Sequence, residues 1–150
     1  MAKGIVTPEL IEQLKAIVGE KYVYTDKDKL EPYSHDEVTD PHYMREPQVV
    51  VLPATTEEVA KVVKLCYDND TVMVPRAAGT GLAAGAVATF GGVIISIERM
   101  NKILEIDKEN MVCVTEPGVT TAVLQSKVAE EGLFYGGDPC SGDSCFIGGN

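Results

Sequence analysis

The stretch from residue 75 to residue 85, PRAAGTGLAAG, concentrates small residues that can wrap the backbone around an anion. Gly79, Thr80 and Gly81 carry no bulky side chain, so consecutive backbone N–H groups can turn toward one anionic group. The Thr80 hydroxyl adds a further donor, and Arg76 adds a positive charge beside the loop. These residue types therefore predict a site for a phosphate or diphosphate group.

The same glycines also have the spacing of a nicotinamide-dinucleotide turn. Gly79, Gly81 and Gly85 match G-x-G-x-x-x-G, and Glu98 lies at the distance of a ribose-binding acid. A Rossmann crossover needs about 10–12 residues with its helix, whereas only residues 86–92 precede the next apolar strand. A Rossmann site is therefore the less favoured alternative. The absence of Gly-Lys-Ser/Thr from the sequence excludes a nucleotide triphosphate P-loop.

A second stretch of small polar residues lies at the end of the sequence. Residues 138–150, DPCSGDSCFIGGN, form a loop that is too long for a hairpin turn, and long loops of this kind are commonly functional. Two such stretches, one central and one terminal, can enclose an extended ligand that contains a diphosphate. We therefore expect them to lie on opposite sides of one ligand.

Hydrophobic periodicity places the central stretch directly after a strand. A continuous apolar strand at 48–53, a helix at 55–70 and a strand at 71–75 predict a β-α-β unit with parallel strands. The buried stripe of this helix is expected to consist of Val59, Val62, Val63, Cys66 and Tyr67.

The other periodic segments surround this unit. They predict a helix at 8–18 with Thr7 as its cap, an irregular connector at 20–47, a strand at 91–100, a hairpin at 102–116 and a helix at 121–131. Parallel and antiparallel pairing in one chain indicates an α+β fold rather than a doubly wound sheet.

Composition argues against several classes of partner. The 150 residues include 23 acidic and 13 basic side chains, and a phosphate backbone would repel their net charge of −10, so no nucleic-acid partner is expected. No apolar run approaches the roughly 20 residues that span a bilayer, and the first residues lack a signal-peptide core. We therefore expect a cytoplasmic protein with reduced cysteines.

Neither metal binding nor a catalytic group can be assigned from spacing. The separation of Cys140 and Cys145, like that of His35 and His42, matches no compact zinc motif. Tyr33, His35 and His42 are the candidates for a general base, but His35 is expected to be structural. We predict no metal site and assign no catalytic residue.

The two loops with their flanking segments resemble the flavin-binding region of the vanillyl-alcohol oxidase/PCMH superfamily. The nearest resemblance is to the family of glycolate oxidases and D-lactate dehydrogenases. The matching segments occur in the family's order: YSHD at 33–36, PQVVVLPATTEEVAKVVKLC at 47–66, VPRAAGTGLAAGAV at 74–87, GGVIISIERMNKILEID at 91–107, TEPGVTTAVLQ at 115–125 and EGLFYGGDPCSGDSCFIGGN at 131–150.

The resemblance implies a domain division and a cofactor. Residues 1–46 would form an N-terminal helix and connector, and residues 47–150 a PCMH-type FAD-binding domain truncated at its C-terminal side. FAD would bind without a covalent link, although Cys140 stands where the family often has glycine. The residues implied to contact FAD are Arg76, Ala77, Ala78, Gly79, Thr80, Gly81, Leu82, Pro117, Gly118, Pro139, Ser141, Ser144, Ile147, Gly148, Gly149 and Asn150.

Three alanines depart from the family pattern. Ala77, Ala78 and Ala84 stand where glycine is common, and an alanine fits without cost only where its φ is negative. Under this resemblance Glu98 has no ribose to bind and instead ends a core strand.

The resemblance also implies an activity. The complete protein would be an FAD-dependent oxidoreductase of small 2-hydroxy acids such as D-lactate or glycolate. A hydride would pass to flavin N5, and electrons would then pass to an electron-transfer flavoprotein or an iron–sulfur subunit. The family's catalytic residues lie beyond the matched part, so this chain alone is expected to be inactive. The alternative is a folded, non-catalytic fragment with weak or no FAD binding.

Overall fold

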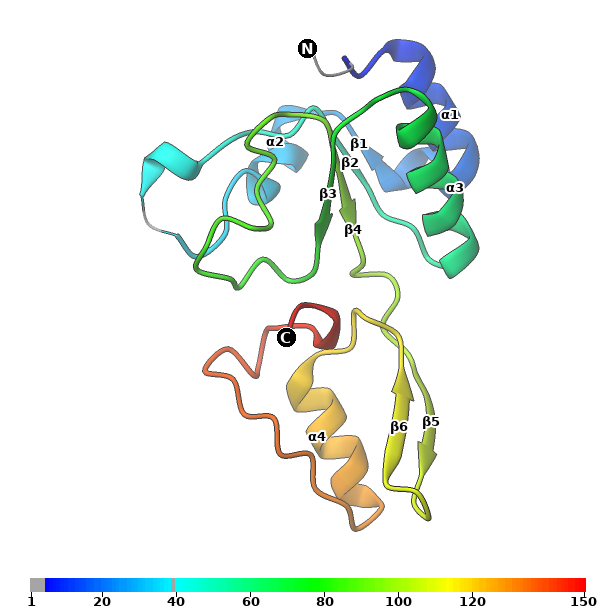
Figure 1. Cartoon of the computed structure of the whole chain (residues 1–150), viewed down its shortest axis with the longest axis vertical. Coiled ribbons are helices and arrows are strands. Elements are labelled where there is room, and N and C mark those ends of the chain that lie inside the picture. The colour runs from blue at the N-terminus through cyan, green and yellow to red at the C-terminus, as the bar shows by residue number, and fades with distance from the viewer. Residues whose placement is uncertain (1–4, 39) are drawn as a thin grey trace.

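Two lobes make up the chain in the computed structural model, which describes residues 5–38 and 40–150 (Figure 1). The N-terminal lobe contains a four-stranded sheet, and the C-terminal lobe contains a two-stranded sheet with one longer helix. The last residues, red in Figure 1, return to the space between the two lobes.

The four-stranded sheet has the strand order β1-β2-β4-β3. Its strands are β1 (Val23–Tyr24), β2 (Val49–Val51), β3 (Met73–Arg76) and β4 (Val93–Ser96). Both β2 and β3 run parallel to β4, whereas β1 is an antiparallel edge strand. The predicted β-α-β unit is therefore present, but β4 lies between its two strands, and the segment expected to be an irregular connector supplies β1.

Helices cover the sheet on both faces. On one face lie α1 (Pro8–Val18) and α3 (Thr56–Asp68), and on the other lies the short α2 (Lys27–Leu30) (Figure 1). The hydroxyl of Thr7 accepts a hydrogen bond from the N–H of Leu10, which confirms the predicted cap of α1. Short 3₁₀ turns, η1 (Glu20–Tyr22), η2 (Glu31–Tyr33) and η3 (Pro41–Tyr43), complete this lobe.

The buried stripe of α3 is narrower than predicted. Val62 and Cys66 are fully buried, but Val63 is 40% exposed and Tyr67 is 78% exposed. The helix packs against both α1 and the sheet. Only residues four positions apart, Val62 and Cys66, lie on the narrow face that these neighbours bury. The prediction for Val63 and Tyr67 was wrong because periodicity does not give the width of the face that a neighbour covers.

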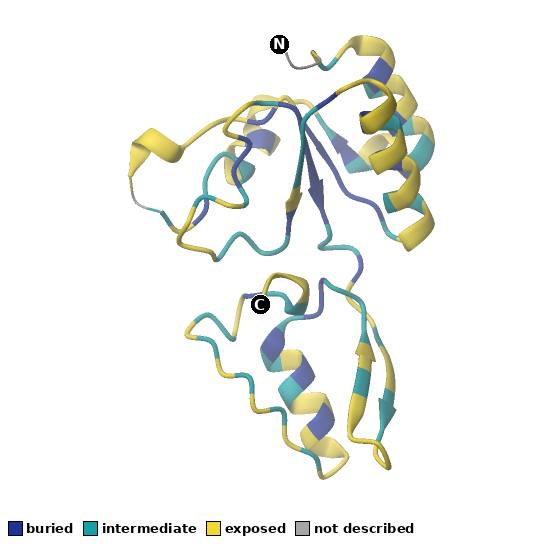
Figure 2. Cartoon of the chain, in the orientation of Figure 1, coloured by how far each residue is buried: buried dark blue, intermediate teal, exposed yellow. Residues whose placement is uncertain are grey.

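Strand residues alternate between two hydrophobic clusters, as expected for a sheet covered on both faces. Val49, Val51 and Val93 pack toward α1 and α3, whereas Val50 and Ile94 pack toward the α2 side. In Figure 2, β2 and β4 are accordingly dark blue, whereas the edge strand β3 is partly exposed. This rigid sheet fixes the point at which β3 ends and the glycine-containing stretch begins.

In the C-terminal lobe, α4 (Thr121–Glu130) packs against a hairpin of β5 (Ile103–Asp107) and β6 (Val112–Thr115). The backbone and side-chain N–H groups of Asn110 donate to the Asp107 carboxylate, which closes the predicted turn. A final 3₁₀ turn, η4, spans Ile147–Gly149. Parallel pairing in one sheet and antiparallel pairing in the other confirm the α+β fold. Across the described residues, no helix has the length and apolarity to cross a membrane.

Candidate functional site

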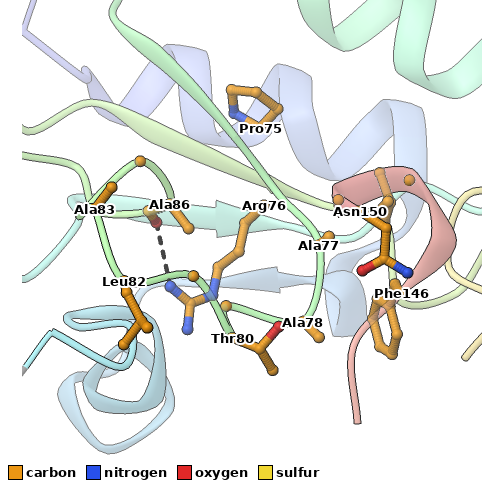
Figure 3. Close-up of a pocket in the computed structure, with 16 residues that line it drawn as sticks. Pro75, Arg76, Ala77, Ala78, Thr80, Leu82, Ala83, Ala86, Phe146 and Asn150 are labelled. Carbon is orange, nitrogen blue, oxygen red and sulfur yellow. Dashed lines mark hydrogen bonds between the residues drawn. The ribbon is translucent and has the colours of Figure 1, made fainter. Parts of the chain in front are cut away.

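A cleft of about 350 Å³ lies where the two lobes meet. One wall is the loop that follows β3, here called the glycine loop (residues 76–86), and the other wall is the C-terminal segment (residues 146–150) (Figure 3). Its lining residues are Pro75, Arg76, Ala77, Ala78, Gly79, Thr80, Gly81, Leu82, Ala83, Gly85, Ala86, Ile97, Phe146, Gly148, Gly149 and Asn150.

The glycine loop winds around the side chain of its own first residue. Arg76 is buried, with 7% of its surface exposed, and lies inside the loop (Figure 3). Its Nη1 donates to the carbonyl oxygen of Ala86 at 3.2 Å, and its Nη2 donates to that of Pro32 at 3.2 Å. The guanidinium therefore ties the start of the loop to its end and to the η2 turn.

Arg76 forms no direct ion pair in the described part of the chain, although the carboxylates of Asp36 and Glu98 lie near enough to stabilise its charge in part. Among the described residues, no Asp or Glu oxygen lies within 4.0 Å of the guanidinium. Burial lowers the pKa of Arg76, but arginine keeps its proton in proteins. A positive charge therefore persists beneath the loop, where an anion in the cleft would lower its energy.

The backbone N–H groups of the glycine loop would also be stabilised by an anion in the cleft. Across residues 77–83, no backbone N–H donates a hydrogen bond to another described residue. The loop contains no helix between β3 and β4, so these groups belong to an open turn. This overturns the Rossmann alternative, which requires a crossover helix directly after the glycines.

Gly79 is required by both space and backbone conformation. Its φ is +75°, a left-handed value that L-residues with a side chain rarely adopt. A Cβ at this position would collide with the guanidinium of Arg76. The glycine therefore allows the loop to close tightly around the arginine.

The three alanines of the loop do not behave alike. Neither Ala77 nor Ala78 has a positive φ, so alanine is accommodated at both positions, whereas Ala84 has a φ of +54°. The left-handed conformation costs alanine about 1–2 kcal/mol, and glycine avoids this cost. Glycine has more freedom in the unfolded chain, however, and this entropy offsets part of the gain in stability.

Ala84→Gly is therefore expected to raise the free energy of unfolding by about 0.5–1 kcal/mol. Chemical denaturation of the two proteins measures the difference. Ala78→Gly is the matched control, and it should lower stability slightly because its φ needs no glycine. Equal effects of the two substitutions would contradict the strain at Ala84.

The C-terminal wall is built on the start of α4. The N–H groups of Thr121 and Ala122 donate to carbonyl oxygens of the last loop, and the side-chain amide of Asn150 donates to the Thr121 hydroxyl at 2.7 Å. The N–H of Gly148 donates to the carbonyl of Pro117 at 2.8 Å. A Cβ added at Gly149 would lie 2.9 Å from the Cβ of Ala77, so this glycine allows the segment to approach the glycine loop closely.

The structure brings together ten of the sixteen residues that were predicted to contact FAD. All seven residues of 76–82 line the cleft, together with Gly148, Gly149 and Asn150. The other six lie elsewhere. Pro117 and Gly118 support the wall from behind, Ser144 lines an adjacent cavity, and Ile147 packs in the core of the C-terminal lobe. Pro139 and Ser141 accept turn hydrogen bonds in the loop before the C-terminal segment.

Sequence reasoning missed several lining residues. Ile97 and Phe146 contribute apolar surface, and nothing in their local pattern marks them. An adjacent cavity of about 300 Å³ shares Arg76 with the cleft and is lined by Tyr33, Ser96 and Glu98. Tyr33 and Glu98 each stood out in the sequence, but their proximity depends on the fold.

Other reactive groups stay apart from the cleft. Within the described part of the chain, no three His, Cys, Asp or Glu side chains form a metal-sized cluster. None of the cysteines lines the cleft among the described residues, and Cys140 is exposed.

Comparison with known proteins assigns the chain to a family. A family model described as an FAD binding domain matches residues 47–150. The chain belongs to the PCMH-type FAD-binding domain family. FAD is the cofactor of this family, in place of a nicotinamide dinucleotide.

Curated members of this FAD-binding family cover nearly the whole chain. A D-lactate dehydrogenase of Anaerostipes hadrus is 44% identical over 89% of this chain and 28% of that protein. Glycolate oxidase subunit GlcD of Bacillus subtilis is 36% identical over 97% of this chain and 31% of that protein. The chain therefore spans less than a third of the length of these relatives.

Solved structures share the fold. A p-cresol methylhydroxylase with substrate bound has a TM-score of 0.75 and 28% identity, covering 85% of this chain and 26% of that one. An alkyldihydroxyacetonephosphate synthase has a TM-score of 0.85 at 24% identity, covering 99% of this chain and 29% of that one. At that identity, the second likeness shows the fold alone.

The residues of the cleft fit the diphosphate of FAD. Free backbone donors across 77–83 and a buried guanidinium supply the charge and hydrogen bonds that a diphosphate requires. A Cβ added at Gly81 or Gly85 would meet no atom of the described residues within 4 Å, so these positions leave room on the open side of the loop.

Proposed function

We propose that this chain is the FAD-binding part of a flavin-dependent dehydrogenase of small 2-hydroxy acids. The observation that carries the proposal is the meeting of residues 76–82 with residues 148–150 around one cleft, where the backbone N–H groups of the glycine loop have no partner among the described residues. These two stretches are far apart in sequence, and one extended ligand accounts for both walls. The names of the relatives indicate the substrate class of 2-hydroxy acids such as D-lactate and glycolate.

The chain's own residues hold and orient the cofactor in this proposal. Backbone N–H groups of residues 77–82 bind the diphosphate, and Arg76 supports them from beneath. Asn150, fixed by Thr121, contacts the cofactor from the opposite wall. When bound, FAD supplies a flavin ring that accepts a hydride from the substrate.

The remaining partners follow from the same proposal. We propose that FAD is held without a covalent link. Electrons would leave to a protein acceptor, either an electron-transfer flavoprotein or an iron–sulfur subunit. The chain spans under a third of its relatives, so we expect the catalytic groups to lie outside it and the chain alone to be inactive. The separation into an N-terminal unit at 1–46 and the FAD-binding domain at 47–150 remains a prediction.

Titration of the purified chain with FAD tests the proposal. We expect flavin fluorescence to be quenched in a saturable way and ADP to compete with FAD, because the loop engages the diphosphate. Adenosine, which lacks phosphate, is the matched control and should compete at least about tenfold more weakly, since charge-assisted hydrogen bonds contribute more than about 1.4 kcal/mol.

Two results would count against binding by this chain. A colourless protein that resists FAD titration would favour the alternative of a folded, non-catalytic fragment. Equal competition by ADP and adenosine would show that the glycine loop does not bind the diphosphate.

A further inference from the structure

Tyr33 and Glu98 form a short hydrogen bond between segments that are distant in sequence. The Tyr33 hydroxyl donates to Oε1 of Glu98 at 2.6 Å, and the two residues are 65 positions apart. The Ser96 hydroxyl donates to the same oxygen at 3.3 Å, so two donors hold the carboxylate. Burial, and then the hydrogen bond to Glu98, raise the pKa of Tyr33 well above its ordinary value of 10.0. The hydroxyl carries its proton at neutral pH and can donate it to Glu98.

This hydrogen bond lies one residue from a support of the glycine loop. Pro32, which precedes Tyr33, provides the carbonyl oxygen that accepts from Nη2 of Arg76. The Arg76 guanidinium carbon lies 5.5 Å from the centre of the Tyr33 ring. Tyr33 and Pro32 both belong to η2, so anchoring the ring also anchors that carbonyl.

The arginine transmits this anchoring to the cleft. Arg76 joins Pro32 at one end and Ala86 at the other, and Gly79 closes over its guanidinium. If the η2 turn moves away, one of the two described acceptors of Arg76 is lost. The guanidinium then becomes free to change rotamer, and the backbone around Gly79 loses the group on which it packs.

We propose that Tyr33 and Glu98 form a clasp that positions Arg76 and thereby holds the glycine loop in its anion-binding shape. The inference rests on the proposed function, because the loop is taken to hold the FAD diphosphate. Both are positioning residues: they act through Pro32 and Arg76 and need not touch the cofactor. The adjacent cavity lined by Tyr33 and Glu98 shares Arg76 and Ala77 with the cleft, so the clasp stands directly beside the loop.

Tyr33→Phe removes one hydroxyl and keeps the ring. We expect the affinity for FAD and for ADP to fall about tenfold, the effect of losing a hydrogen bond to a charged group. Tyr43→Phe is the matched control, because this tyrosine is 46% exposed and its hydroxyl has no partner among the described residues. It should leave both affinities unchanged within about twofold.

Conservative rescue distinguishes positioning from general support of the fold. Glu98→Gln keeps an oxygen that accepts from Tyr33 and should retain FAD affinity within about threefold, whereas Glu98→Ala should match Tyr33→Phe. In the Glu98→Ala background, Tyr33→Phe should have no further effect beyond about twofold. Independent, additive effects of the two substitutions would overturn the clasp.

A cofactor-free measurement separates this inference from the proposed function. Arg45, Arg76 and Arg99 are the arginines of the chain, so their Nε–Hε signals in a ¹⁵N-labelled sample can be assigned by substitution. Tyr33→Phe should shift the Arg76 signal and speed its exchange with water, while Tyr43→Phe should not. An unchanged Arg76 signal in Tyr33→Phe would overturn the clasp. If the wild-type chain binds no FAD, but Tyr33→Phe still shifts the Arg76 signal and speeds its exchange, only the proposed function of this chain is refuted.

Discussion

Replacement of Gly79 by alanine is expected to remove most of the affinity for FAD and ADP. The left-handed φ of +75° costs alanine about 1–2 kcal/mol, and the new methyl group would collide with the Arg76 guanidinium. The loop must open or the arginine must leave its carbonyl acceptors, and either change turns the backbone N–H groups away from a common point. We expect affinity to fall by more than about tenfold, measured by flavin fluorescence titration and ADP competition.

Gly81→Ala provides the control within the same loop. Its φ is not positive, and its Cβ would lie more than 4 Å from every atom in the described part of the chain, apart from its immediate neighbours. Its free energy of unfolding should therefore equal that of the wild type or exceed it slightly, whereas Gly79→Ala should unfold at a lower denaturant concentration. Equal stability and equal ADP affinity for Gly79→Ala and the wild type would show that the loop does not close around Arg76.

Arg76→Lys is expected to have a comparably large effect although it preserves the charge. A single ammonium group cannot reproduce the planar fork that reaches Ala86 and Pro32 together, so one of these two part-buried hydrogen bonds from a charged donor is lost. Such a loss costs about 1–3 kcal/mol of stability. FAD affinity should fall by about ten- to a hundredfold, because the loop loses its internal support.

Arg99→Lys is the matched control for an arginine outside the cleft. Arg99 also donates to a carbonyl, that of Leu52 at 2.7 Å, and it stacks on the Tyr22 ring at 3.3 Å. Its replacement should lower stability, again by about 1–3 kcal/mol, but leave FAD affinity within about twofold. Loss of FAD affinity in proportion to stability in both variants would mean that Arg76 supports only the fold.

Local elements followed from the sequence because their signals are local. Thr7 and Pro8 mark the start of α1, and Asp107 and Asn110 close the β5–β6 turn, since caps and turns depend on side chains a few residues away. The concentration of small residues between 75 and 85 likewise indicated an anion-binding turn, because backbone access depends on the absence of side chains.

The order of strands did not follow from the same patterns. A continuous apolar run shows that a strand is buried on both faces, but it does not say which strand lies beside which. The insertion of β4 between β2 and β3 depends on packing between distant segments. The exposed side chains of Val63 and Tyr67 have the same origin, because only the neighbouring helix limits the buried width of α3.

The sequence by itself determined the family, the expected cofactor, and the loop that combines glycines with Arg76. Tertiary structure decided how that loop is held: Arg76 lies inside it, bound to carbonyls, and Tyr33 meets Glu98 beside it. It also decided that Ala84, rather than Ala77 or Ala78, takes the strained φ. The physical reason is the distance over which each interaction acts. A residue type limits the backbone conformations that its own position can adopt, whereas contacts between distant segments select one conformation and one partner.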